Sequence, residues 1–257
     1  MRLVVVTLFP GLIESYLSQG IVGRAAQRGL FTTELVDPRL FTEDRHRTVD
    51  DVPFGGGAGM VMKAEPLARA IESVEPVARR ILLTPTGAPF RQVDAERLSR
   101  LDSVLFVCGR YEGIDGRVVE QLIDEEVSIG DFVVSGGELG ALVVMDALVR
   151  LLPGALGNED SAVHETFTSG LLEHAHYTRP AVWRGHAVPE VLLSGHHAEI
   201  ERWRRRESLR LTAARRPDLL SRVLLSGEER RYVDALLKRE ESNDERPDGG
   251  REPSAAE

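Results

Sequence analysis

The sequence has little cysteine, few aromatic residues and no long apolar run. A single cysteine, Cys108, excludes an intrachain disulfide and a metal site built from several thiolates. It ends the apolar segment Val104–Cys108, so we expect a small core residue rather than a catalytic thiol. No apolar run approaches the length of a membrane span. The first apolar run stops at Pro10 without a small-residue cleavage site, which favours a buried strand over a signal peptide and predicts a cytoplasmic protein.

The chain also lacks a net positive charge, which at first argues against a nucleic-acid partner. Its formal charge is −9, but the last residues, 240–257, carry seven acids and two arginines. In contrast, Glu199–Arg216 carries seven arginines against three glutamates. Because a local field matters more for binding a polyanion than the total charge, this segment keeps nucleic acid open as a partner. The competing interpretation is a solvated helix face.

Strand-like and helix-like segments alternate in the first part of the chain. Apolar runs that predict strands are Leu3–Phe9, Ile81–Thr84, Val104–Cys108 and Val127–Val134. Helical patterns lie at Glu65–Val77, Gln92–Leu101 and Leu139–Leu152. Continuously apolar strands separated by helices are typical of an α/β domain with a mostly parallel sheet, which we place at residues 1–156.

The second part has a different composition. Residues 157–170 are polar and without apolar periodicity, which predicts a linker or loop. Residues 171–239 predict a small helical domain, with helices at His196–Arg206, Arg216–Leu225 and Glu228–Arg239 and a short extended segment at Pro189–Gly195. The charged residues 240–257 contain no aromatic side chain and are expected to be disordered.

Three glycine-containing clusters lie at the ends of predicted strands. They are Leu83–Gly87, Cys108–Asp115 and the run Glu125–Glu138, which closes on Gly136-Gly137. Ligand sites in α/β proteins lie where strands end, so the three together favour a binding site over separate structural turns. A fourth cluster is Asp50–Met60, whose glycines lie in Phe54–Met60. It follows no clear strand and matches neither a P-loop nor a dinucleotide fingerprint, so alone it is weak evidence.

Six motifs occur in this order over roughly residues 1–220: FGGGAGM, LTPTGAP, CGRYEGID, SIGDFVVSGGE, LPGALGN and YTRP. Together they resemble the motifs of the bacterial tRNA (guanine-N1)-methyltransferases that modify guanosine 37. The resemblance implies a SPOUT-type α/β fold, in which the end of the α/β domain forms a deep trefoil knot that binds S-adenosylmethionine. A knot is otherwise a rare exception among folds. The cofactor contacts implied by the resemblance are Pro85, Gly109, Tyr111, Glu112, Ile129, Gly130, Asp131, Phe132, Val133, Val134, Gly136 and Gly137.

The chemistry of the implied substrate explains two further residues. Neutral guanine carries a proton on N1, so a general base must remove it and the charge that develops on O6 needs a partner. By resemblance Arg150 lies near O6, and Glu165 takes the position where the family has an aspartate base. Glutamate is one methylene longer, and Asp160 and His164 are rival candidates for the base.

The resemblance also implies partners. These are a homodimer with shared active sites, and a tRNA anticodon arm whose phosphates would contact the basic segment through Arg202, Arg204, Arg205 and Arg210. Family members use Mg²⁺, for which the sequence offers no dedicated site, and the histidines show no zinc-like spacing with acids. Two alternatives stay open: a SPOUT enzyme acting on another RNA position, such as a ribose 2′-hydroxyl, and a catalytically silent RNA-binding dimer.

Overall fold

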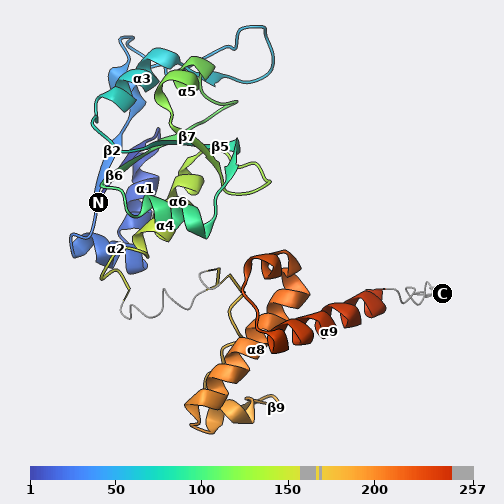
Figure 1. Cartoon of the computed structure of the whole chain (residues 1–257). Helices are drawn as coiled ribbons and strands as arrows, with labels where there is room; N and C mark the ends of the chain where they lie inside the picture. Colours follow the sequence, from blue (N-terminus) through green and yellow to red (C-terminus); the bar gives the residue numbers. More distant parts are fainter. Residues whose placement is uncertain (157–165, 168–169, 245–257) are drawn as a thin grey trace, which may run out of the picture. The chain divides into compact units, whose positions relative to one another are not determined.

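The computed structural model describes residues 1–156, 166–167 and 170–244 of the chain (Figure 1). The chain divides into two compact units, Met1–Ala162 and Val163–Glu257. Each unit has a hydrophobic core of its own. Within the described residues, no helix combines the length and the apolar character that crossing a bilayer requires.

A five-stranded parallel sheet forms the centre of the first unit. The strands are β1 (Arg2–Val6), β2 (Thr32–Val36), β5 (Arg80–Pro89), β6 (Ser103–Cys108) and β7 (Glu125–Ser128). Their order is β2-β1-β6-β5-β7, and all neighbours run parallel. The α/β class and the parallel sheet expected from the sequence are therefore confirmed.

Helices cover both faces of this sheet (Figure 1). On one face lie α3 (Ala64–Glu72) and α5 (Gly116–Leu122); on the other lie α1 (Pro10–Leu17), α2 (Gly20–Gln27), α4 (Gln92–Leu98) and α6 (Glu138–Val149). Successive residues of β1 join the two opposite cores, Leu3 on one side and Val4 on the other. Burial on both faces explains why the central strands read as unbroken apolar runs.

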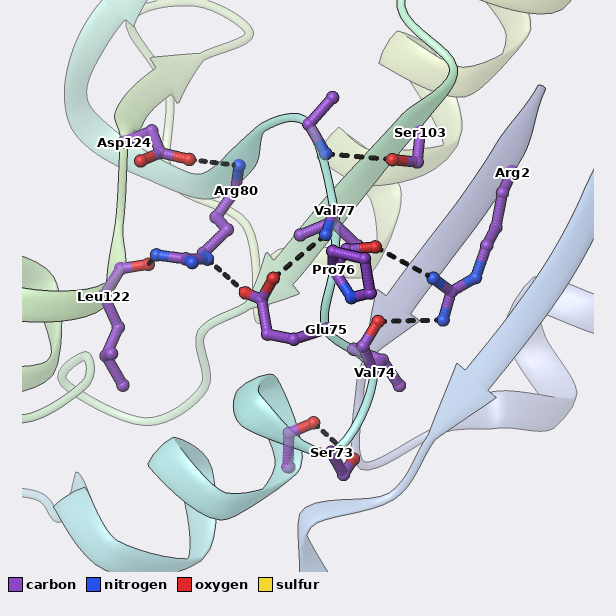
Figure 2. Close-up of polar contacts among 12 residues, drawn as sticks. Arg2, Ser73, Val74, Glu75, Pro76, Val77, Arg80, Ser103, Leu122 and Asp124 are labelled. Atoms are coloured by element: carbon purple, nitrogen blue, oxygen red, sulfur yellow. Dashed lines mark hydrogen bonds and ion pairs between the residues drawn. The ribbon is translucent and has the colours of Figure 1, made fainter.

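The connection between α3 and β5 is held at the amino ends of the strands. Figure 2 shows the Arg2 guanidinium donating to the carbonyl oxygens of Val74, at 2.9 Å, and Pro76, at 3.2 Å. Glu75 accepts from Arg80 Nε at 2.6 Å, and the backbone N–H of Arg80 donates to Asp124 at 2.7 Å. These contacts fix the edge of the sheet from which β1 and β5 start.

Shorter elements complete the first unit. A 3₁₀ helix, η1, spans Pro38–Phe41, and β3 (Asp50–Asp51) pairs antiparallel with β4 (Val61–Met62). This pair brackets the glycine-rich segment Phe54–Met60.

The second unit is mainly helical. It contains the β-hairpin β8 (Val182–Trp183) and β9 (His186–Ala187), the 3₁₀ helices η2 (Glu190–Leu193) and η3 (Pro217–Arg222), and the helices α8 (His197–Arg215) and α9 (Gly227–Asp244). Its core is small and centres on Leu171, Leu209 and Val233. Two helices that pack on each other around a few buried side chains agree with the expected C-terminal helices.

Several predicted elements were wrong in detail. The strand expected at Val127–Val134 stops at Ser128, because Gly130 adopts φ 142° and turns the chain into a loop. The helix expected over Arg216–Leu225 is only the 3₁₀ helix Pro217–Arg222, and the extended segment expected at Pro189–Gly195 contains η2. Helix α9 continues to Asp244, so the predicted disordered tail begins within a helix, and its part after Asp244 lies outside the described residues.

Candidate functional site

A cavity of about 250 Å³ lies at the carboxyl ends of β6 and β7, beside the point after Leu83 where the regular pairing of β5 is interrupted. Three segments line it: Leu82–Pro85 within β5, the loop Gly109–Ile114 and the loop from Ile129 to Gly137. These are the three glycine-containing clusters of the sequence. Their convergence at one edge follows from the parallel sheet, whose strands all end on the same side.

Backbone contacts join the second and third loops. The N–H of Gly137 donates to the carbonyl oxygen of Gly109 at 2.9 Å, and Arg110 pairs with Gly136 through an isolated β-bridge. A Cβ at position 137 would lie 2.8 Å from the Cα of Cys108, closer than real Cβ contacts allow. Glycine is therefore required at Gly137 for the two loops to meet.

A buried ion pair lies beside this junction. The Glu138 carboxylate is 1% exposed; its Oε1 accepts from Thr7 Oγ1 at 2.8 Å, and its Oε2 lies 2.9 Å from the Arg110 guanidinium. Arg110 also donates to the carbonyl oxygen of Ser135 at 3.0 Å and lies over the ring of Phe9, 4.2 Å from its centroid. Among the described residues, neither Arg110 Nε nor Glu138 Oε2 has a partner with hydrogen-bond geometry, so the pair is held mainly by charge.

The loop Gly109–Ile114 carries backbone strain at Tyr111. Its φ of 60° is in the left-handed region, which costs energy for a residue other than glycine, and such strain clusters at ligand sites. Burial raises the pKa of the Tyr111 hydroxyl, and the charge of Asp50 raises it further. The next residue, Glu112, donates its N–H to the carbonyl oxygen of Met60 at 3.0 Å, which brings the Phe54–Met60 cluster against this loop.

The structure brings most of the predicted cofactor residues together. All of them line the cavity except Asp131, which is exposed in the same loop. Sequence reasoning missed several lining residues that lie between the named ones: Leu82, Leu83, Thr84, Arg110, Gly113, Ile114, Val127, Ser128, Ser135 and Gly140. The signal that could have found them was the continuity of each motif, since neighbours in a tight loop face the same space.

Of the two predicted catalytic residues, the structure describes only one. Arg150 is the C-terminal cap of α6, where its N–H donates to the carbonyl oxygen of Asp146 at 3.1 Å. Glu165 and its rivals Asp160 and His164 lie outside the described residues.

Every arginine predicted to contact phosphate has an acidic partner on the structure. Arg204 and Arg210 pair along α8 with Glu201, at 2.7 Å, and Glu207, at 2.6 Å. Arg205 pairs with Glu229 of α9 at 2.6 Å, and Arg202 is 4.0 Å from Glu199. The arginine side chains are all at least 37% exposed, although Glu207 and Glu229 are only 16% and 24% exposed. Ion pairs near the surface contribute little to stability, so the arginines can exchange partners at low cost.

Cys108 is a core residue, as expected. It is 1% exposed at the end of β6. Burial raises the pKa of its thiol well above the usual range, and the nearby Glu138 carboxylate raises it further. A thiol held protonated in the core is not a nucleophile.

Comparisons with known proteins show the family to which the chain belongs. Residues 1–222 match the family model of "tRNA (Guanine-1)-methyltransferase TrmD". A tRNA (guanine-N(1)-)-methyltransferase of Brevibacillus brevis is 52% identical over 238 residues, which cover 92% of this chain and 98% of the relative. A protein of the same name from Chloroflexus aggregans is 56% identical over 231 residues, covering 88% and 90%. One from Dehalococcoides mccartyi is 50% identical over 248 residues, covering 95% and 100%.

Proposed function

Because the chain belongs to the tRNA (guanine-1)-methyltransferase family, we propose that its cavity binds S-adenosylmethionine and that its target is guanosine 37 of tRNA. The chain is a tRNA guanine-N1 methyltransferase, and S-adenosylmethionine is its methyl donor. The observation that carries the proposal is the cavity at the carboxyl ends of β6 and β7 and beside Leu83 of β5, which three glycine-containing segments line.

The lining of the cavity suits this cofactor. Leu83, Ile129 and Val134 offer apolar surface for an adenine ring. Backbone N–H and C=O groups of the glycine loops come close enough to give a purine and a ribose their hydrogen bonds. Glu112 also lines the cavity and supplies a carboxylate for the amino group of the methionine part. The proposal includes a trefoil knot of the loops around this site, which rests on membership of the family.

The reaction needs a base and an electrostatic partner from the protein. When bound, S-adenosylmethionine supplies an electrophilic methyl group on a sulfonium ion. Glu165 accepts the proton from guanine N1, which frees the N1 electron pair to bond to the methyl carbon. The sulfur would keep the electrons of the broken S–CH₃ bond and leave as a neutral thioether. Arg150 stabilises the negative charge that develops on O6 during this step, an interaction that strengthens toward the transition state. By the resemblance, Glu165 stands where the family has an aspartate base. Glutamate is one methylene longer, and a carboxylate misplaced by about 1 Å would lower the rate roughly a hundredfold.

The active site is proposed to be shared between two copies of the chain. In support, α6 carries Leu139 and Val143 one turn apart, both 50% exposed, close in sequence to the exposed cavity residues Phe132 and Val133. An apolar patch of this kind is typical of a protein interface. Val143→Arg is expected to convert a dimer to a monomer in analytical ultracentrifugation, whereas Leu224→Arg, at an exposed apolar position in the second unit, leaves the dimer intact.

The basic segment of α8 is proposed to bind the anticodon arm. Arg202, Arg204, Arg205 and Arg210 would exchange their glutamate partners for phosphate oxygens, which bind guanidinium groups well. Mg²⁺ dependence is also part of the proposal, with no residues assigned to the ion. It is tested by removing Mg²⁺ with a chelator and restoring it during a methylation assay.

The decisive experiment maps the methylated nucleotide. The purified chain is incubated with labelled S-adenosylmethionine and an unmodified tRNA transcript that carries guanosine 37. We expect label in the wild-type transcript and a primer-extension stop at position 37, because N1 methylation blocks base pairing. A transcript with adenosine at position 37 is the matched control and should stay unlabelled. Label at another nucleotide, or on a ribose, would reject guanosine 37 as the target.

A further inference from the structure

Three side chains in the second unit form a cluster outside the cavity. Glu173, His174 and His176 each offer one ligand atom, and these atoms lie within 4.8 Å of one another. His176 Nε2 lies 2.9 Å from Glu173 Oε1, and the rings of His174 and His176 are 4.6 Å apart between centroids. Two imidazoles and one carboxylate are a donor set that transition metals bind in proteins. The sequence analysis found no zinc-like spacing of histidines with acids, so it missed this grouping.

The surrounding residues hold this segment in place. Leu171 is buried in the core of the second unit, and the N–H of Leu172 donates to Thr212 Oγ1 of α8 at 3.0 Å. The N–H of Glu173 donates to Thr166 Oγ1 at 3.1 Å. Anchored backbone at the start of the cluster lowers the entropy that binding an ion would otherwise cost.

Aromatic contacts orient the cluster from the other side. Trp203 of α8 has its ring 6.2 Å from the ring of His174 and 6.2 Å from that of Tyr177. In addition, His174 Nδ1 lies 3.2 Å from the carbonyl oxygen of Ala175. When Nδ1 donates its proton to this carbonyl, Nε2 keeps a lone pair, which is the arrangement typical of metal-binding histidines.

We propose that Glu173, His174 and His176 form a binding site for a divalent transition-metal ion, with Zn²⁺ as the natural test ion. In a tetrahedral zinc site with bonds of about 2 Å, ligand atoms are about 3.3 Å apart. His176 Nε2 and Glu173 Oε1 are 2.9 Å apart, close to that value, and the ligand atom of His174 lies within 4.8 Å of both. Three protein ligands leave a fourth position for water.

This site is distinct from the Mg²⁺ of the proposed reaction. Mg²⁺ prefers oxygen ligands in octahedral geometry and dehydrates reluctantly, whereas imidazole nitrogen favours zinc, nickel and copper. The inference rests on the side chains of the second unit alone and stands whether or not the proposed target nucleotide is correct.

The test uses the full chain without an affinity tag, stripped of metal by a chelator and titrated with Zn²⁺ in a calorimeter. We expect one strong site per chain, a rise in the unfolding temperature with Zn²⁺, and tetrahedral absorption bands when Co²⁺ replaces Zn²⁺. His174→Ala and His176→Ala should each weaken Zn²⁺ binding at least tenfold, and the double variant should remove the site.

His197→Ala is the matched control, because His197 is an exposed histidine of the same unit outside the cluster. It should bind Zn²⁺ like the wild type. Circular dichroism of the metal-free variants separates loss of Zn²⁺ binding from loss of folding. Glu173→Gln tests whether the carboxylate is a metal ligand, because it removes the charge with little change in the shape of the side chain. Equal Zn²⁺ binding by the wild type and the double variant would overturn the proposal, as would a wild-type chain that binds no Zn²⁺.

Discussion

Replacing Glu138 by glutamine tests the buried ion pair beside the cavity. The substitution keeps the size of the side chain and a group that accepts from Thr7, but it removes the charge that faces Arg110. Breaking a buried pair by removing one partner costs about 3–5 kcal/mol, because the other charge stays uncompensated. The Arg110 side chain is 18% exposed and keeps its contacts with Ser135 and Phe9, so we expect about 3 kcal/mol.

This loss should be visible in calorimetry. In a protein of this size, 1 kcal/mol lowers the unfolding temperature by roughly 2–4 °C, so Glu138→Gln should lower it by roughly 6–12 °C. Glu120→Gln makes the same charge change at an exposed position of the same unit and should alter the free energy of unfolding by no more than about 0.5 kcal/mol.

A double variant separates the pair from its surroundings. Arg110→Met combined with Glu138→Met removes both charges and keeps apolar volume, so it should be more stable than Glu138→Gln alone. We expect a coupling free energy of about 1–3 kcal/mol from the full cycle of single and double variants. If Glu138→Gln unfolds like Glu120→Gln, the ion pair does not stabilise the junction of the cavity loops and the reasoning is refuted.

The proposed function predicts the outcome of two substitutions, and the structure predicts two further outcomes. Glu165→Gln should bind S-adenosylmethionine normally while methyl transfer falls about 10²- to 10⁴-fold, and near-full turnover would reject Glu165 as the base. Arg150→Ala should lower kcat about 10²- to 10³-fold with little change in cofactor affinity; a loss of affinity alone would remove its role at O6. Gly137→Ala should weaken cofactor binding in calorimetry, because its Cβ would meet Cys108, whereas Gly116→Ala, which has open space, should not. Arg117 and its backbone N–H lower the pKa of Asp115 to about 2, so Asp115 stabilises the fold above pH 4 and loses this effect as the pH falls toward 2. In urea, Asp115→Asn should therefore have a lower free energy of unfolding than the wild type at pH 6 and about the same value at pH 2. An equal difference at both pH values would contradict this.

The central strands could be predicted from the sequence because burial on both faces requires a continuous run of apolar residues. Strands β1 and β6 are covered on both faces, so Val4 and Leu105 sit in unbroken apolar runs that were identified. Strand β2, Thr32–Val36, was missed because it lies at the edge of the sheet and mixes polar and apolar residues. An edge strand is less completely buried than a central strand, so its sequence lacks the continuous apolar run from which a strand can be predicted.

The loop from Ile129 to Val134 shows the opposite error. Its β-branched and aromatic residues are typical of strands, and the sequence pattern predicted one. Tertiary structure prevailed, because Gly130 turns the chain and places Phe132, Val133 and Val134 on the wall of the cavity. The apolar character of this loop suits a surface that covers a ligand, a role that local propensity does not distinguish from burial in a sheet.

The partners of Glu138 could not be predicted from the motif that contains it. The sequence places an acidic residue after Gly137 at the start of a helix, where an exposed carboxylate would suit the helix dipole. In the structure its partners come from positions far away in the sequence, Thr7 at the end of β1 and Arg110 after β6. Only the parallel order of the strands brings these three side chains together.

The arginines of α8 show why counting charges overstates a binding surface. Pairs such as Glu201 with Arg204 and Glu207 with Arg210 could be expected from their helical spacing, but the pair between Arg205 and Glu229 joins two helices and could not. Each arginine that contacts a phosphate must first release its carboxylate partner. The released carboxylate then binds cations from solution, which offsets part of the cations that the phosphates release. The dependence of tRNA affinity on salt should therefore be shallower than the number of arginines implies, since the net count of released ions is smaller. The surface gains specificity from this arrangement, because only a backbone that meets several guanidinium groups at once displaces all of their partners.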